Sequence, residues 1–251
     1  MNTPVHSIAT HGAENVFISQ DWSAYTAEQH RAWSILYQRR IAALRTVACR
    51  RYLEGAQAIG LSPKQIPDLT EMNRRLQVRT GWSAVPVSGF LEPADFFSCL
   101  AQRRFPTTIT IRALDRLDYV PEPDIFHDVF GHVPLHADPV FGDFLQRFGA
   151  IAACSRTPEE RRRLTRLFWF TVEFGLIEEA GAVRVYGSGL ISSQADCANA
   201  LSPACDLRPF RLDDVLEQEF TTDELQNVLF VVSSFDQLFA AIQELEARME
   251  G

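Results

Sequence analysis

The chain has 251 residues, a formal net charge of -8, and a composition that is 46% hydrophobic and 22% charged. This composition is typical of a soluble globular protein, and the length suits one large domain or two small ones. The acidic balance disfavours a nucleic-acid surface, because phosphate binding requires a basic field. No apolar stretch has the length of a membrane span, so we expect neither a nucleic-acid nor a membrane partner.

The cysteines and the N-terminal residues favour a cytoplasmic protein. The number of cysteines is odd and no two of them form a close pair, which favours reduced thiols in the core. The first residues lack the apolar segment of a secretory signal. We expect residues 1–14 to be a disordered tail and residues 15–251 to form one mainly α-helical domain with small β elements. The cysteines are Cys49, Cys99, Cys154, Cys197 and Cys205.

Hydrophobic periodicity predicts helices in the first half of the chain. Apolar residues recur at three- and four-residue spacing from Thr26 to about Gly60, which predicts one long helix. A second helix is expected over residues 68–81 and a short one after Pro93, with a loop between them. The β-branched alternation of residues 107–112 predicts a strand.

The second half of the chain begins with a clear helix start. Thr157, a proline at the first helical position and Glu160 form a capping-box pattern, which predicts a helix running to about Ile177. Residues 184–193 suggest short strands and turns after Gly181. Residues 235–251 are expected to form an amphipathic C-terminal helix.

Two histidines lie five residues apart in the apolar segment PDIFHDVFGH, residues 123–132. Asp124 can cap a helix there, Gly131 is expected to end it, and Pro134 should prevent its continuation. On a regular helix His127 and His132 would diverge, unless the helix widens at the glycine. They are either hydrogen-bonded core histidines or metal ligands. The nearby His136 is expected at the surface.

Glu173 is the one charged residue in the apolar segment LFWFTVEFGLI, residues 167–177. A buried carboxylate needs a cation or a proton, so Glu173 either pairs with an arginine or binds a metal. Thr165 and Trp169 should share its helix face. Two histidines and one carboxylate form a facial triad, which points to non-haem Fe(II) and O₂ chemistry. A zinc hydrolase is disfavoured because no general-base glutamate adjoins the histidines.

Four segments of the chain resemble the pterin-dependent aromatic amino acid hydroxylases, and most closely the bacterial members that hydroxylate phenylalanine. They read RTGWSAVPVSGFL, DYVPEPDIFHDVFGHVPL, FWFTVEFGL and YGSGLISS, and the resemblance extends from about Trp22 to the C-terminus. It implies a mainly helical catalytic domain that holds one Fe(II) and consumes tetrahydrobiopterin and O₂. The implied reaction is hydroxylation of L-phenylalanine to L-tyrosine. The alternatives are tryptophan, tyrosine or another ring position as target, or a non-catalytic aromatic amino acid or pterin sensor.

The resemblance also implies roles for individual residues. His127, His132 and Glu173 match the iron ligands. The pterin-binding positions are Gly89, Phe90, Leu91, Phe96 and Asp128, and the substrate-binding positions are Arg112, Trp169, Phe174 and Ser192.

The chain differs from the family pattern in several places, among them Thr165, which replaces a small apolar residue near the pterin. Glu92 and Pro93 replace small hydroxyl residues of the pterin loop, and residues 221–232 replace a more aromatic segment near the pocket mouth. The chain has no room for the regulatory N-terminal domain of animal members, and its last helix is too short for their tetramerising coiled coil. We therefore expect a monomer.

Overall fold

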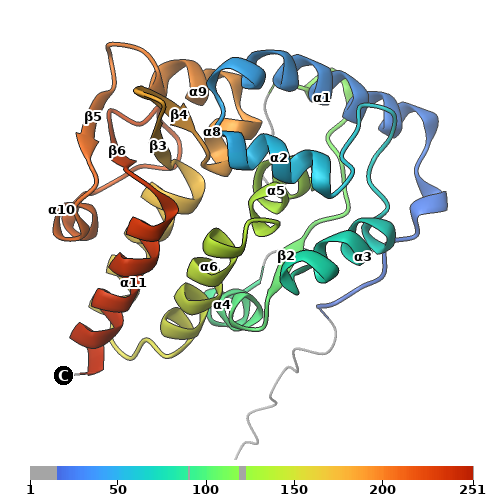
Figure 1. The fold of residues 1–251 in the computed structure, drawn as a ribbon. Coiled ribbons are helices and arrows are strands. Elements are labelled where there is room, and N and C mark those ends of the chain that lie inside the picture. Colours follow the sequence, from blue (N-terminus) through green and yellow to red (C-terminus); the bar gives the residue numbers. More distant parts are fainter. Residues whose placement is uncertain (1–15, 90, 119–122, 251) are drawn as a thin grey trace, which may run out of the picture.

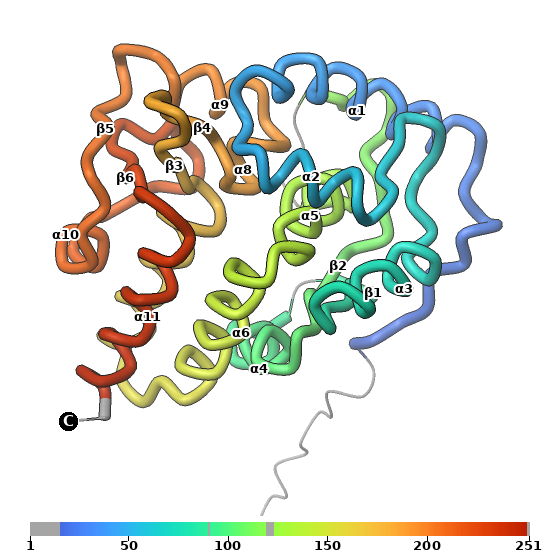
Figure 2. The backbone as a smooth tube through the Cα atoms, viewed as in Figure 1, coloured from blue at the N-terminus to red at the C-terminus, as the bar shows by residue number. Residues whose placement is uncertain are grey.

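A computed structural model describes residues 16–89, 91–118 and 123–250 (Figures 1 and 2). The mainly α-helical fold expected from the sequence is confirmed. The α-helices of the described residues are α1 (Ala27–Val47), α2 (Arg50–Ala58), α3 (Leu69–Thr80), α4 (Pro93–Ala101), α5 (Val133–His136), α6 (Pro139–Ala153), α7 (Pro158–Phe168), α8 (Ser188–Ser192), α9 (Gln194–Ala200), α10 (Leu212–Glu217) and α11 (Phe235–Glu250).

Two π-helical segments and two short 3-10 turns complete the helical part of the residues that the structure describes. The π-helices are η4 (Phe126–His132) and η5 (Trp169–Glu173), and the 3-10 turns are η2 (Trp22–Ala24) and η3 (Leu114–Arg116). The π-helices contain the three residues of the predicted metal triad.

Six short strands within the described ranges form two small sheets. β1 (Ser83–Pro86) and β2 (Arg104–Thr107) pair in parallel. The second sheet has the order β4-β3-β6-β5. In it β3 (Leu176–Glu179) runs antiparallel to β4 (Ala182–Val185) and parallel to β6 (Val228–Val232), which also pairs in parallel with β5 (Asp206–Pro209). This sheet follows η5 directly, so it fixes the chain just beyond Glu173.

The apolar core is centred on α6. This helix crosses the middle of the molecule, with α11 packed along one side and α4 along another (Figure 1). Its apolar face buries Phe141, Phe144, Leu145 and Phe148, each at most 2% exposed. Burying an aromatic or leucine side chain stabilises a fold by about 1.5–3 kcal/mol, so this face makes a large contribution.

The long helix predicted from Thr26 to Gly60 is divided in two. Thr26 caps α1 in a capping box with Gln29, as its position favours. The chain is extended at Ala48, which pairs with Val185, and the Cys49 thiol accepts a hydrogen bond from the first turn of α2. A partner from the distant sheet therefore interrupts a helical pattern that is continuous in the sequence.

The helix predicted over residues 68–81 is confirmed as α3, capped by Asp68 and ended by Gly81 with φ of +77°. The short helix after Pro93 is confirmed as α4. The strand predicted over residues 107–112 is wrong, because the strand lies at Arg104–Thr107. Beyond Thr107 the backbone bonds to other elements: the Ile109 carbonyl accepts from the Tyr25 hydroxyl and the Thr110 carbonyl from the Ile125 amide.

The helix predicted from Thr157 begins with the expected capping box and continues as α7. It widens into η5 at Trp169 and ends at Glu173, before the predicted end. The segment predicted as strands and turns contains β4 but also the short helix α8. The C-terminal helix is confirmed as α11.

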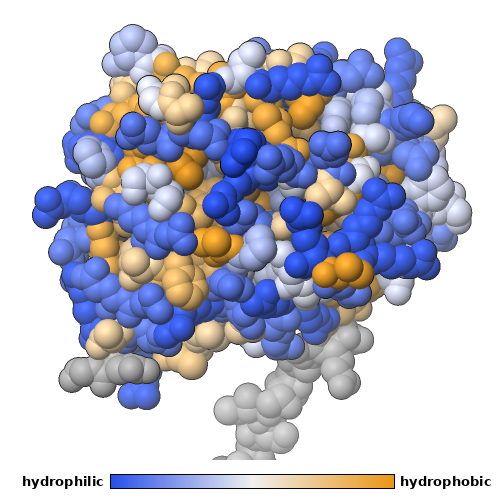
Figure 3. All heavy atoms as spheres, in the orientation of Figure 1, coloured by the Kyte–Doolittle hydropathy of each residue, from blue (hydrophilic) through white to orange (hydrophobic). Residues whose placement is uncertain are grey.

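On the face shown in Figure 3 hydrophilic residues predominate, with smaller hydrophobic areas between them. None of the helices in the described ranges has the length and hydropathy needed to cross a bilayer.

All five cysteines are free, and Cys154 alone among them is exposed. The expected tail, residues 1–14, lies outside the described residues.

Candidate metal centre

His127 and His132 share one face of η4 because this segment is a π-helix. On an α-helix residues five apart point about 140° away from each other. In a π-helix the hydrogen bonds join residues five apart, so their side chains come close to alignment. The widening that the sequence left open is therefore present, and it extends over the whole of Phe126–His132. π-helical turns are rare and frequent at functional sites.

Gly131 does not end the helix, and Pro134 does not prevent its continuation. The chain continues from η4 into α5, with Pro134 in the first turn, where a missing amide donor costs little. A Cβ atom at Gly131 would lie 3.1 Å from the Ser188 carbonyl oxygen and 3.2 Å from the Ser188 Cβ. The glycine is therefore explained by the close approach of α8 rather than by a helix end.

Glu173 is the last residue of η5. The Phe174 amide donates to the Trp169 carbonyl at 2.8 Å, a bond between residues five apart. Trp169 and Glu173 both face the cleft described below, whereas Thr165 is exposed and does not line it. The shared face predicted for these three residues is therefore correct for Trp169 alone.

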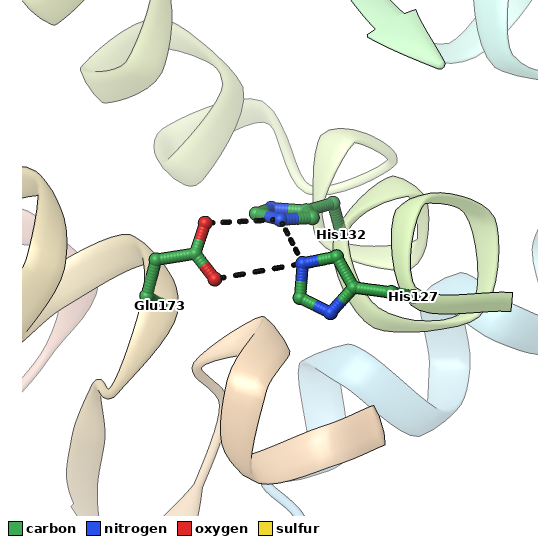
Figure 4. A group of neighbouring side chains, drawn as sticks. All are labelled: His127, His132 and Glu173. Carbon is green, nitrogen blue, oxygen red and sulfur yellow. Dashed lines mark hydrogen bonds and ion pairs between the residues drawn. The ribbon is translucent and has the colours of Figure 1, made fainter. Parts of the chain in front are cut away.

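The three side chains converge on one point. Figure 4 shows the imidazoles of His127 and His132 directed at the carboxylate of Glu173, which comes from a separate segment of the chain. The His132 Nε2 atom lies 3.2 Å from Glu173 Oε1, the His127 Nε2 atom 3.7 Å from Oε2, and the two Nε2 atoms are 3.3 Å apart. Donors about 2.1 Å from one ion, at right angles to each other, would be about 3.0 Å apart. The donor set therefore fits a single metal ion bound facially.

Hydrogen bonds fix which nitrogen of His127 faces the ion. The Ser192 hydroxyl donates to the Ser188 carbonyl at 2.8 Å and lies 2.9 Å from His127 Nδ1. Because the Ser192 hydroxyl already donates its proton to Ser188, its oxygen accepts a hydrogen bond from the Nδ1–H of His127. The Nε2 atom of His127 then carries no proton, and its lone pair is free for a metal. Burial lowers the pKa of His127, which favours the neutral imidazole that a metal requires.

Glu173 is ionised in the site. Burial acts to raise its pKa, but the His132 and His127 imidazoles and a hydrogen bond from Ser188 lower the pKa to about 2. Within the described residues Glu173 pairs with the two histidines and not with an arginine. A metal ion binds the imidazoles in their neutral form, so two such ligands and one carboxylate would carry one negative charge, which suits a divalent ion.

A cleft of about 720 Å³ opens beside the triad, and His127 and Glu173 contribute to its wall. All four residues predicted to bind substrate line it: Arg112, Trp169, Phe174 and Ser192. The remaining lining includes Leu36, Leu117, Phe168 and Thr222. Such a concave, partly apolar site next to a metal suits a small organic ligand with few polar groups.

Arg112 is held in place by Asp124. The guanidinium donates to both carboxylate oxygens, at 2.8 Å from Nε and 3.0 Å from Nη2, and also to the Leu117 carbonyl. Burial acts to raise the pKa of Asp124, but these bonds hold the pKa below its usual value. Asp124 is therefore the carboxylate partner of Arg112. Arginine has five N–H donors, so two stay available for a ligand carboxylate.

Trp169 stands in an aromatic stack at the cleft wall. Its ring lies 4.5 Å from Phe220 at an interplanar angle of 14° and 4.7 Å from Phe174 at 32°. Its indole N–H donates to the Gln226 side chain at 3.2 Å. Gln226 is only 6% exposed and also donates to the Thr221 carbonyl. Sequence reasoning missed Gln226, because nothing near it in the chain indicates a tryptophan partner.

The residues predicted to bind pterin lie beyond this cleft. Gly89 is exposed and would have open space around a Cβ atom, and Leu91 is half-buried. The Phe96 ring packs edge-on to Phe168 with centroids 5.8 Å apart, so it adjoins a residue that lines the cleft. Asp128 is buried and accepts two hydrogen bonds from Thr108, at 2.7 and 2.8 Å. The predicted position at Phe90 lies outside the described residues.

His136 was expected at the surface and is instead completely buried. Its Nδ1 atom bonds to the His132 carbonyl at 3.0 Å, and its ring packs against Trp82 with centroids 4.6 Å apart. Burial lowers the pKa of His136 to about 3, so the ring is neutral. It supports the backbone of a metal ligand without being one.

The site and fold together define a mononuclear non-haem metal enzyme with a facial His₂-carboxylate triad. A family model described as biopterin-dependent aromatic amino acid hydroxylase matches residues 18–250. The chain belongs to this family, as the sequence motifs indicated.

One curated relative and two solved structures from the same organism are similar to this chain over most of their length. Phenylalanine-4-hydroxylase of Chromobacterium violaceum is 39% identical over 233 residues, which cover 92% of this chain and 78% of the relative. A crystal structure of the phenylalanine hydroxylase from that organism with oxidised Fe(III) matches with a TM-score of 0.90 at 37% identity, covering 96% and 90% of the two chains. A second, with iron(III) and 7,8-dihydrobiopterin, has a TM-score of 0.89 at 36% identity, covering 99% and 94%.

Proposed function

We propose that this chain is a phenylalanine 4-monooxygenase, which uses Fe(II), a tetrahydropterin such as tetrahydrobiopterin, and O₂ to convert L-phenylalanine to L-tyrosine. The observation that carries the proposal is the convergence of His127, His132 and Glu173 at the wall of a partly apolar cleft. Family membership and the iron and pterin in related structures support the cofactors.

In this proposal the triad holds the iron and the protein positions the organic ligands around it. Iron supplies the activation of O₂, which needs coordination positions that three protein ligands leave open. Arg112 binds the substrate carboxylate with its free donors, a task for which a planar guanidinium is well suited. Ser192 orients His127 and contributes to the same end of the cleft.

The proposed pterin site is formed by Gly89, Phe90, Leu91 and Phe96, with Asp128 nearby. The contact between Phe96 and Phe168 supports it, because Phe168 also lines the substrate cleft. A pterin ring stacked on Phe96 would therefore lie near both the substrate and the iron. Its flat aromatic surface suits an offset stack on a phenyl ring.

The ring-binding part of the cleft favours phenylalanine over tyrosine. Trp169 and Phe174 offer apolar surface, and the one indole donor of Trp169 is already bonded to Gln226. A tyrosine hydroxyl buried there without a partner would cost about 1–3 kcal/mol. Thr222, a polar residue of the altered C-terminal segment, lines the cleft and could lessen this cost. Tryptophan is limited by its size.

A competition experiment tests the choice of substrate. With equimolar phenylalanine, tyrosine and tryptophan, and with Fe(II), tetrahydrobiopterin and O₂, tyrosine formed from phenylalanine should be the main product. The preference in kcat/KM over tyrosine should be about tenfold or more, the ratio that corresponds to the buried hydroxyl. Isotopically labelled phenylalanine separates the tyrosine that is formed from the tyrosine that is added. Dominant 5-hydroxytryptophan or dihydroxyphenylalanine would refute the phenylalanine assignment and leave the iron and pterin chemistry standing.

We further propose that the enzyme acts as a cytoplasmic monomer on small molecules, with neither nucleic-acid nor membrane partners. The acidic net charge and the free cysteines support this. A non-catalytic amino acid or pterin sensor is disfavoured, because a sensor does not require two histidines and a carboxylate arranged around one point.

A further inference from the structure

We propose that Ser188 is a positioning residue that holds one oxygen of the Glu173 carboxylate, so that a bound metal takes the other. The inference rests on the proposed function, since it assumes that Glu173 is a metal ligand. Nothing in the motifs that identify the family singles out this serine. Its role follows from its contacts and from how α8 is anchored.

The Ser188 hydroxyl has one proton and a charged acceptor for it. It donates to Glu173 Oε2 at 2.6 Å, while the Val172 carbonyl lies at 3.4 Å. A short hydrogen bond to a carboxylate is about twice as strong as one between neutral groups. The Ser188 hydroxyl therefore donates to Glu173 and not to the Val172 carbonyl. Ser188 is 1% exposed, so water does not compete for this bond.

The helix that carries Ser188 is packed tightly against both metal-ligand segments. A Cβ atom at Gly131, in η4, would lie 3.1 Å from the Ser188 carbonyl oxygen and 3.2 Å from the Ser188 Cβ. On the other side, a Cβ at Gly187 would lie 2.4 Å from the Glu173 carbonyl oxygen. There is therefore little room for α8 to shift relative to η4 or η5.

Arg40 fixes the far end of the same helix. Its Nε atom donates to the Ile191 carbonyl at 2.8 Å and its Nη2 atom to the Leu190 carbonyl at 2.9 Å. These are carbonyls of the last turn of α8, which have no partner within the helix. Arg40 is 4% exposed, and within the described ranges it forms no ion pair with a carboxylate. Its charge is directed to the negative end of α8.

α8 thus contacts two of the three metal ligands, through Ser188 to Glu173 and through Ser192 to His127. The two contacts have different consequences. Ser192 selects the nitrogen that faces the metal. Ser188 makes Oε2 the weaker metal donor, because that oxygen already accepts a strong hydrogen bond, and leaves Oε1, 3.2 Å from His132 Nε2, as the ligand. Glu173 then occupies one coordination position instead of two.

The experiment compares Ser188→Ala with Thr171→Val. Thr171 lies in η5 and is buried, and its hydroxyl donates only to the Leu167 carbonyl. Thr171→Val therefore removes a buried hydroxyl near Glu173 and leaves the carboxylate untouched. Each purified variant is titrated with Co(II), whose visible absorption weakens as its coordination number rises. Circular dichroism and thermal melting verify that each variant is folded.

In Ser188→Ala both carboxylate oxygens are free to bind, so the Co(II) absorption should weaken and change shape. Thr171→Val should keep the wild-type spectrum. A Ser188→Ala spectrum identical to the wild type overturns the inference, while Co(II) binding by the wild type still supports the metal centre. Failure of the wild type to bind Co(II) overturns both.

Discussion

Replacing His132 with alanine should reduce the iron content from about one atom per chain to near zero. His132 supplies a nitrogen within 3.3 Å of the other two donor groups, and two remaining ligands hold a divalent ion far more weakly than three. Hydroxylation should fall by more than about 100-fold, the upper range for residues that merely support metal ligands. Iron is measured by atomic emission after anaerobic loading, and product is measured by chromatography.

The variant should still fold. The His132 ring is 5% exposed and packs on Phe105, so its removal leaves a cavity that costs about 2–5 kcal/mol. Domains of this size are typically stable by about 5–15 kcal/mol. His30→Ala is the control, since this histidine packs on Trp22 and Tyr25 away from the cleft. A folded His132→Ala variant with full iron content and full turnover would show that His132 is not a ligand.

Arg112→Lys should raise the KM for phenylalanine about 10-fold or more and leave the iron content unchanged. The arginine uses one edge of its guanidinium for Asp124 and keeps further donors for the substrate carboxylate. Lysine retains the charge but cannot form two parallel hydrogen bonds to one carboxylate and still reach another. Losing a hydrogen bond between charged groups costs about 1.5–3 kcal/mol, which corresponds to about 10- to 150-fold in affinity.

Arg147→Lys provides the matched control. Arg147 also forms a pair with a carboxylate through Nε and Nη2, in this case Glu246, and does not line the cleft. Steady-state kinetics on both variants separate the effect on substrate binding from the general cost of the exchange. If both variants keep the wild-type KM, Arg112 does not bind the substrate carboxylate.

Local signals in the sequence predicted the helices with clear ends. Thr26 and Thr157 cap α1 and α7 with complete capping boxes, and Gly81 ends α3 in the left-handed conformation. These features depend on side chains within one turn of the helix end, so the sequence contains all the partners. The chemical identity of the triad could also be predicted, because a lone carboxylate in an apolar segment requires a cation.

Features that depend on distant partners could not be predicted. The interruption after α1 arises because Ala48 pairs with Val185, far away in the sequence. The strand at Arg104–Thr107 exists because Ser83–Pro86 lies beside it in parallel. The burial of His136 depends on Trp82 and on a backbone carbonyl.

The π-helices explain why the spacing of the histidines was ambiguous. Sequence periodicity distinguishes 3.6 residues per turn from two, but it does not reveal a local widening in a segment that is apolar on all sides. Packing against α8 and the sheet accompanies the widening at η4 and η5. The roles of Ser188 and Gln226 could not be predicted either, because each contacts a residue at least 15 positions away in the sequence.

Formation of tyrosine from phenylalanine by the purified wild-type chain tests the central claim most directly. The reaction contains ring-labelled phenylalanine, Fe(II), tetrahydrobiopterin and air, and parallel reactions omit iron with a chelator present or omit the pterin. The account predicts labelled tyrosine, hydroxylated at the para position, only when both iron and pterin are present. Labelled tyrosine formed equally well without iron or without pterin, or no hydroxylated product from a folded, iron-loaded protein, would contradict it.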